Sequence, residues 1–176
     1  MSDGKRSIAQ LATEAGLRRV HVITWRDLDH PEAGGSEVHI AALCRRWAAA
    51  GVEITLRTGA VPGGSRSLER DGYTVRRAGG RISVLARNAL TEALHAGGRH
   101  GLVEVWHGIN FLAPLWARGP RIAFAHHVHA GQFGAVLPAP AARVAEGLER
   151  HAYPRLYRTT PLVTLSPSSR DALIEL

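Results

Sequence analysis

Two adjacent glycines, Gly34 and Gly35, stand directly before Ser36 and Glu37. An alternating, β-branched stretch over residues 19–25 precedes them and predicts a strand, and apolar residues at helical spacing follow them. A glycine-rich turn between a strand and a helix directs unpaired N–H groups and the positive end of the helix dipole at the sheet edge, with no Cβ atoms in the way. The pattern indicates either a diphosphate-binding turn or an ordinary turn in which Ser36 caps the helix and Glu37 complements its dipole.

Three histidines, His107, His126 and His127, each come shortly after a predicted strand. His127 and His129 share one side of an extended chain and could converge on zinc. However, no Cys-x-x-Cys or His-Glu-x-x-His motif accompanies them, and catalytic zinc usually takes three protein ligands. We therefore expect no metal, and we expect these histidines either to be structural or to hydrogen-bond a bound ligand.

Two serines, Ser166 and Ser168, follow the last predicted strand. They lack the Gly-x-Ser-x-Gly motif that places a nucleophilic serine on a sharp turn. One of them is expected to cap the final helix.

The rest of the chain alternates between strand-like and helix-like patterns. Strands are expected at residues 19–25, 52–58, 73–77, 102–106, 121–125 and 161–165, and helices at 7–16, 36–50, 82–94, 111–116, 141–153 and from 166 onward. Loops are expected at residues 26–35, 61–67 and 130–140. The alternation predicts an α/β fold, a Rossmann-like doubly wound, mostly parallel sheet with helices on both faces. Ligands bind such sheets beyond the carboxyl ends of the strands, where the glycines, histidines and serines above all fall.

The apolar stripes of two predicted helices are expected to form core. On this basis Trp47 of the helix over residues 36–50 and Leu90 of the helix over residues 82–94 should be nearly buried. Truncating a buried Leu90 to alanine would cost on the order of 2–5 kcal/mol.

Length and composition indicate one globular domain. The chain has 176 residues, of which 45% are hydrophobic and 21% are charged, and its single cysteine, Cys44, is expected to be a buried thiol. Neither a membrane-spanning apolar run nor a signal-peptide core is evident, so a cytoplasmic location is expected. The net charge is +7, but the arginines are scattered, which argues against nucleic-acid binding. They indicate a solvated basic surface or attraction to an anionic substrate or a membrane surface.

A nicotinamide-dinucleotide site fits the pattern poorly. Such a site requires Gly-x-Gly-x-x-Gly close to the first strand and an acidic residue about 20 positions later, whereas the glycines here are adjacent and the second strand ends in Arg57, Thr58 and Gly59. A fragment of a Rossmann oxidoreductase and a non-catalytic interaction domain remain as alternatives.

Four segments together carry a resemblance to a known family. They are His30–Glu37 with the helix after it, Val103–Gly108, Arg121–Gln132 and Tyr157–Ser169. In this order they resemble the N-terminal half of the family 4 glycosyltransferases, and the resemblance extends from the first strand to the last residue.

The resemblance implies a GT-B enzyme, in which two Rossmann-like domains enclose the active site. The N-terminal domain mainly receives the acceptor, while a C-terminal domain, absent from this chain, binds the nucleotide-sugar donor and supplies a Glu-x7-Glu motif. Such enzymes retain the anomeric configuration and need neither metal nor cofactor. The chain alone is therefore expected to fold without turnover, and its partners are expected to be donor, acceptor, its C-terminal domain and, weakly, a membrane surface.

The resemblance also implies roles for particular residues. The glycine-rich loop approaches the donor diphosphate, which matches Gly34 and Gly35 with Ser36 beside them. A histidine after a strand contacts the transferred sugar, which best matches His126 and secondly His127. The remaining candidates on the cleft rim, near the acceptor, are Glu37, His107, Ser166 and Ser168.

Overall fold

The structure, a computed structural model, describes residues 6–106, 109–126 and 139–175. The strands are β1 (Arg19–Ile23), β2 (Glu53–Thr58), β3 (Ser67–Arg70), β4 (Tyr73–Arg77), β5 (Gly101–Trp106), β6 (Arg121–Ala125) and β7 (Leu162–Val163). The helices are α1 (Ile8–Glu14), α2 (Gly35–Ala49), α3 (Ser83–Leu94), α4 (Ala113–Trp116), α5 (Ala139–Gly147), α6 (Tyr153–Leu156) and α7 (Pro167–Glu175). A 3₁₀ turn, η1 (Ala96–Gly98), follows α3, and a π-helical segment, η3 (Leu148–Ala152), joins α5 to α6.

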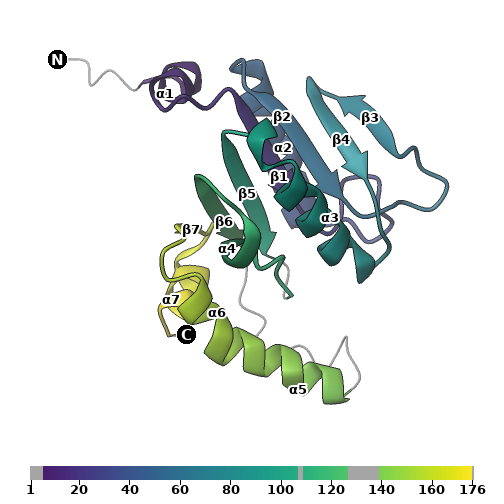
Figure 1. Cartoon of the computed structure of the whole chain (residues 1–176), viewed down its shortest axis with the longest axis vertical. Coiled ribbons are helices and arrows are strands. Elements are labelled where there is room, and N and C mark those ends of the chain that lie inside the picture. The colour runs from purple at the N-terminus through teal and green to yellow at the C-terminus, as the bar shows by residue number, and fades with distance from the viewer. Residues whose placement is uncertain (1–5, 107–108, 127–138, 176) are drawn as a thin grey trace.

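The seven strands form one sheet in the order β3-β4-β2-β1-β5-β6-β7 (Figure 1). All neighbouring strands are parallel except β3 and β4. The order runs outward in both directions from β1, so the chain reverses its direction of winding between β1 and β5. The predicted α/β, doubly wound, mostly parallel sheet is therefore confirmed, and the carboxyl ends of β1, β5 and β6 lie side by side at one edge.

Helices cover both faces of the sheet because side chains alternate between the faces along each strand. On one face Ile40 and Cys44 of α2 pack on apolar side chains of five strands: Val20, Val22, Ile54, Leu56, Tyr73, Val75, Val103, Val105 and Phe124. On the other face Leu85 of α3 and Ala113 of α4 pack against Ile23 and Leu102. Cys44 is buried, as expected, and burial raises the pKa of its thiol to about 12.

The sequence pattern missed strand β3. The two-residue turn Asp71-Gly72 joins it to β4, and both residues have positive φ angles, 47° and 85°. A turn with two positive φ angles fits the right-handed twist of paired strands, and Asp-Gly is among the sequences that form it. Residues 67–77 therefore form an antiparallel hairpin at the sheet edge.

Two other predicted elements differ in extent. The predicted helix over residues 141–153 is a longer run that begins at Ala139, passes through the π-helical segment and ends at Leu156. The predicted strand over residues 161–165 shrinks to Leu162–Val163, which forms the exposed edge of the sheet. In the described part of the chain, no helix has the length and apolar character to cross a bilayer.

Helix α3 is rotated relative to the prediction, and the expectation for Leu90 is wrong. Leu90 is 62% exposed, and Ile82 and Leu94 are 78% and 73% exposed. The buried side of α3 instead carries Val84, Asn88 and Glu92. Glu92 turns inward because Arg57 of β2 and Arg99, which follows η1, pair with its carboxylate, and this pairing outweighs the burial of the apolar stripe. Trp47 is only partly buried, though it does pack against the α2 core.

We therefore expect Leu90→Ala to change the free energy of unfolding by less than about 0.5 kcal/mol, because an exposed side chain loses little burial when it is truncated. Leu102→Ala is the matched comparison, since Leu102 is 2% exposed, and it should cost about 2–5 kcal/mol. Denaturant titration of both variants measures the difference. A loss at Leu90 as large as that at Leu102 would contradict the observed rotation of α3.

Candidate functional site

The glycine pair forms the start of α2, as the sequence predicted. Gly34 is the N-cap and Gly35 is the first helical residue. The backbone N–H of Gly34 donates to Oε2 of Glu37 at 2.7 Å, and the Ser36 hydroxyl donates to the same oxygen at 3.0 Å. The helix is thus capped by Glu37 rather than by Ser36, the residue proposed as its cap.

The capping arrangement decides which backbone donors remain for a ligand. None of the hydrogen bonds in the described chain uses the N–H groups of Gly35 and Ser36. A Cβ atom built on Gly35 would meet no atom within 4 Å, and one on Gly34 would meet only Glu37 Oε2 at 3.7 Å. The glycines are therefore not required by the packing of this loop, and the space in front of the helix N-terminus is open.

Glu37 is itself held in place from the loop. It is 3% exposed, and its Oε1 accepts a hydrogen bond from Nε of Arg26 at 3.3 Å. Arg26 also reaches Glu32 at 3.1 Å. The negative charge at the start of α2 is therefore balanced by an arginine, which limits its repulsion of an anionic ligand.

His126 lies directly after β6, at the edge where α2 begins. It is 8% exposed, and its Nε2 lies 3.2 Å from Nδ1 of His39, with the two rings nearly perpendicular. His39 is one helical turn beyond Gly35, on the same side of α2. Burial, and secondly the charge of Arg46, lowers the pKa of His39. A neutral imidazole has one donor and one acceptor nitrogen. One ring of this pair can therefore donate an N–H hydrogen bond to the other ring, and this bond fixes the orientation of both.

The end of β7 also converges on His126. Ser166 caps α7 by accepting from the backbone N–H of Ser169 at 3.1 Å. The Ser169 hydroxyl then donates to the backbone carbonyl of His126 at 2.9 Å. Ser168 is exposed, and its hydroxyl contacts only that of Ser166 among the described residues. Of the two serines, one of which was expected to cap this helix, Ser166 is the one that does so, and the helix start anchors the His126 segment.

The structure therefore brings the start of α2, His126 and Ser166 to one rim. His107 and His127 lie outside the described residues, as does His129 of the zinc alternative, so their predicted roles remain predictions. Within the described ranges no group of three or more His, Cys, Asp or Glu side chains has the geometry to hold a metal ion.

A buried ion pair, which no sequence pattern indicated, lies behind the glycine loop. Nε of Arg77, at the end of β4, donates to Asp27 at 2.7 Å, and both side chains are almost fully buried. Arg77 and Arg70 also pair with Asp29, and these hydrogen bonds, from Arg77 first, lower the pKa of Asp29. The interpretation of Arg77 as part of a solvated basic surface is wrong, because it fastens the loop after β1 to the end of β4.

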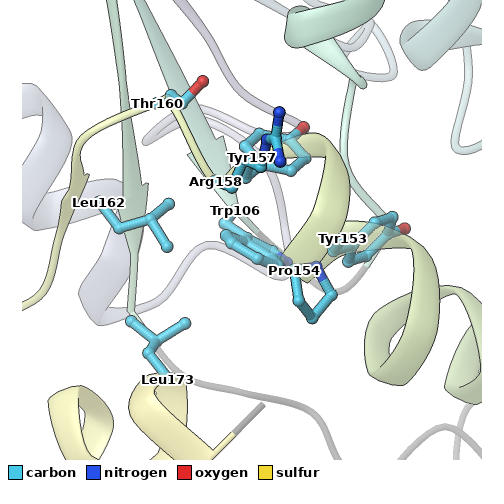
Figure 2. Close-up of a pocket in the computed structure, with 8 residues that line it drawn as sticks. All are labelled: Trp106, Tyr153, Pro154, Tyr157, Arg158, Thr160, Leu162 and Leu173. Atoms are coloured by element: carbon cyan, nitrogen blue, oxygen red, sulfur yellow. The ribbon is translucent and has the colours of Figure 1, made fainter.

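A second buried carboxylate, Glu104 of β5, lies behind an aromatic pocket. It accepts a hydrogen bond from the Tyr157 hydroxyl at 2.7 Å. Tyr157 stacks on Trp106, with ring centroids 5.2 Å apart. The pocket has a volume of about 310 Å³, with Trp106 and Tyr153 on one side and Leu162 and Leu173 on the other (Figure 2). It lies beside β7 and α7 and contains none of the predicted site residues.

Glu104 should make the stability depend on pH. Burial raises its pKa to about 7, against the weaker opposing effect of the Tyr157 hydrogen bond and nearby backbone N–H groups. A raised pKa stabilises the fold at low pH, and the contribution is lost as the pH rises through the folded pKa. We expect a loss of about 2 kcal/mol between about pH 5 and pH 7.

Glu104→Gln, which keeps the shape but does not titrate, should remove this loss. Denaturant unfolding of the wild type and of Glu104→Gln at several pH values gives the free energy of unfolding of each protein. The difference between the two proteins isolates the contribution of Glu104, because the histidines titrate in both and cancel. A wild-type-minus-variant difference that does not change between these pH values would contradict the assignment.

The model of glycosyltransferase family 4 matches residues 33–176. A comparison with curated proteins gave no significant match. The matched range begins at the residue before Gly34 and includes every residue of the rim described above.

Proposed function

Because this chain belongs to glycosyltransferase family 4, we propose that it is the acceptor-side domain of a retaining hexosyltransferase that uses a nucleotide-sugar donor. The observation that carries the proposal is the rim itself. The N–H groups at the open start of α2 have no partner among the described residues, and beside them lies a histidine whose ring is oriented by a second histidine.

The start of α2 suits the leaving diphosphate. As the bond to the sugar breaks, the diphosphate gains negative charge, and fixed N–H donors with a helix dipole stabilise that charge without a metal or cofactor. The donors to the diphosphate would be the N–H groups of Gly35 and Ser36, because the N–H of Gly34 is already bound to Glu37. This refines the expectation that both glycines supply a donor.

His126 suits the role of orienting the transferred sugar. It is largely buried and its Nε2 is hydrogen-bonded to His39. The ring is therefore held in one orientation, which suits a hydrogen bond to the sugar better than nucleophilic attack. The two carboxylates beside the glycines, Glu32 and Glu37, are both bound by Arg26, which gives no support to a double displacement by this domain alone.

The proposal includes a second domain that binds the nucleotide and carries the Glu-x7-Glu acids. Without it this domain should fold but transfer no sugar. The competing dinucleotide function makes a different prediction, namely that NADH binds and its fluorescence changes. We expect no NADH binding, and the loop after β1 lacks the Gly-x-Gly-x-x-Gly spacing that such binding requires.

Gly35→Val tests the phosphate site. The new side chain should fill the space in front of the helix N-terminus and weaken nucleotide-sugar affinity about tenfold or more. Folding should be nearly unaffected, because Gly35 has no positive φ and a Cβ there meets no atom within 4 Å. Calorimetric titration of the full-length protein with nucleotide-sugars, alongside its melting temperature, measures both effects.

Gly97→Val is the matched control, since Gly97 is also exposed and has free space around its Cβ position. It should leave the affinity unchanged. Wild-type affinity in a folded Gly35→Val protein would remove the glycine pair from the site and leave the α2 start as an ordinary turn.

A further inference from the structure

A second pocket lies on the same edge of the sheet, one strand beyond the glycine loop. It has a volume of about 430 Å³ and is formed where β2 and β4 end and α3 begins. Its walls are the turn over residues 60–66, the turn over residues 77–80, and Ser83 and Arg87 of α3. Its size is within the range of small-molecule sites.

The pocket is strongly cationic. Arg66, Arg77 and Arg87 line it, and no acidic side chain does so among the described residues. The charge of Arg77 is balanced from behind by Asp27 and Asp29. The guanidinium groups of Arg66 and Arg87 have no hydrogen-bond or ion-pair partner in the described chain. Two positive charges therefore remain available to a ligand.

Hydrogen bonds and close backbone packing hold the walls of the pocket in place. Arg77 donates to the backbone carbonyl of Ser65, which holds the first turn against β4. Gly79 has φ +83°, and a Cβ there would lie 2.8 Å from the backbone N of Val84, so only glycine permits this approach to α3. The Ser83 hydroxyl accepts from the N–H of Gly80 at 2.9 Å, which fixes the start of the helix.

We propose that this pocket binds a phosphate ester carried by the acceptor, with Arg66 and Arg87 as its ligands. Arginine presents a planar fork of donors that matches the oxygens of a phosphate. The pocket is connected to the glycine loop through the Asp27–Arg77 pair, so acceptor and donor phosphate would bind on adjacent strands of one rim. The assignment to an acceptor rests on the proposed function, whereas the binding of phosphate does not.

The phosphate ester has two possible sources, a soluble phosphosugar or a lipid headgroup. An exposed apolar stripe on α3, formed by Ile82, Leu90 and Leu94, starts beside the pocket. The test therefore includes free phosphate esters and a lipid surface as separate arms.

The test is a residue-resolved NMR titration of the 176-residue chain with inorganic phosphate and glycerol 3-phosphate, at constant ionic strength. We expect saturable shifts of the side-chain N–H signals of Arg66 and Arg87 and of the backbone N–H of Gly79. Flotation with phosphatidylcholine vesicles, with and without phosphatidic acid, forms the lipid arm. Binding to free esters assigns a soluble source, and binding only to the vesicles with phosphatidic acid assigns a lipid source.

The double variant Arg66→Gln/Arg87→Gln should lower the affinity in either arm about tenfold or more. The control Arg45→Gln/Arg118→Gln removes the same charge from two other exposed arginines and should bind as the wild type does. An equal loss of phosphate affinity in both double variants would overturn the proposal. So would chemical-shift changes confined to Gly35 and Ser36. Because no sugar transfer is measured, that failure would leave the proposed glycosyltransferase function standing.

Discussion

Replacing His126 with alanine in the full-length protein should lower kcat by about a hundredfold to a thousandfold. Removal of one preorganised polar contact to a developing transition state typically has this effect. His126 is 8% exposed and held by His39 and, through its carbonyl, by Ser169. Its position is therefore fixed before the sugar binds, and alanine leaves no group that could replace it.

Steady-state kinetics with saturating donor and acceptor measure the change, and circular dichroism checks the fold. His95→Ala is the matched control, because His95 is exposed at the C-terminal end of α3, and among the described residues its ring bonds only to the local carbonyl of Thr91. It should leave kcat unchanged. A fully active His126→Ala enzyme would exclude His126 from the site.

Replacing Glu92 with alanine should destabilise the fold by about 3–5 kcal/mol, as expected when one partner of a buried ion pair is removed. The Glu92 carboxylate accepts from His21 at 2.8 Å, from Arg99 at 2.8 Å and from Nε of Arg57. Glu92 is fully buried and the Arg99 side chain is 2% exposed. Alanine would leave the charges of both arginines unpaired in the interior.

Denaturant unfolding measures this loss. Glu53→Ala is the control, since Glu53 is exposed at the start of β2 and its truncation should cost less than about 0.5 kcal/mol.

Burial alone would raise the pKa of Glu92, but hydrogen bonding and charge from His21 and then Arg57 lower it below its ordinary value. A lowered pKa stabilises the fold above the unfolded pKa, so this contribution should disappear as the medium is acidified. A stable Glu92→Ala protein would contradict the role of Glu92 in fixing α3.

The sheet could be predicted because its pattern is local. The strands are short stretches that either alternate or are apolar throughout, and the glycines between the elements end or begin helices at fixed positions. Gly51, for example, has φ +87° and ends the α2 region as expected. The hairpin of β3 and β4 was missed because β3 is short and polar. The Asp71-Gly72 turn was the signal that could have revealed it.

The orientation of α3 could not be predicted in the same way. Its apolar stripe is real, but hydrophobic periodicity does not register that His21 and Arg57, from distant parts of the chain, and Arg99, from just after the helix, surround Glu92. The cost of leaving that carboxylate or those arginines unpaired in the interior exceeds the gain from burying Leu90 and Leu94. A single acid between apolar helix positions, together with arginines at strand ends, is a weak signal for such a cluster.

The rim was predicted in position but not in detail. The rule that ligands bind at the carboxyl ends of strands placed Gly34, Gly35, His126 and Ser166 correctly at one edge. His39 was missed because a lone histidine within a helix does not stand out until its distance to His126 is known. The capping of Gly34 by Glu37 was likewise hidden, because Ser36 offered an equally plausible cap.

The most direct test of the central claim is sugar transfer by the full-length protein. The protein would be incubated with a panel of nucleotide-sugars and acceptors, with and without phosphate esters, in the presence of a metal chelator. Proton NMR would report the anomeric configuration of the product. We expect chelator-resistant transfer with the donor's configuration retained. An inverted product, or no transfer together with saturable NADH binding, would contradict it.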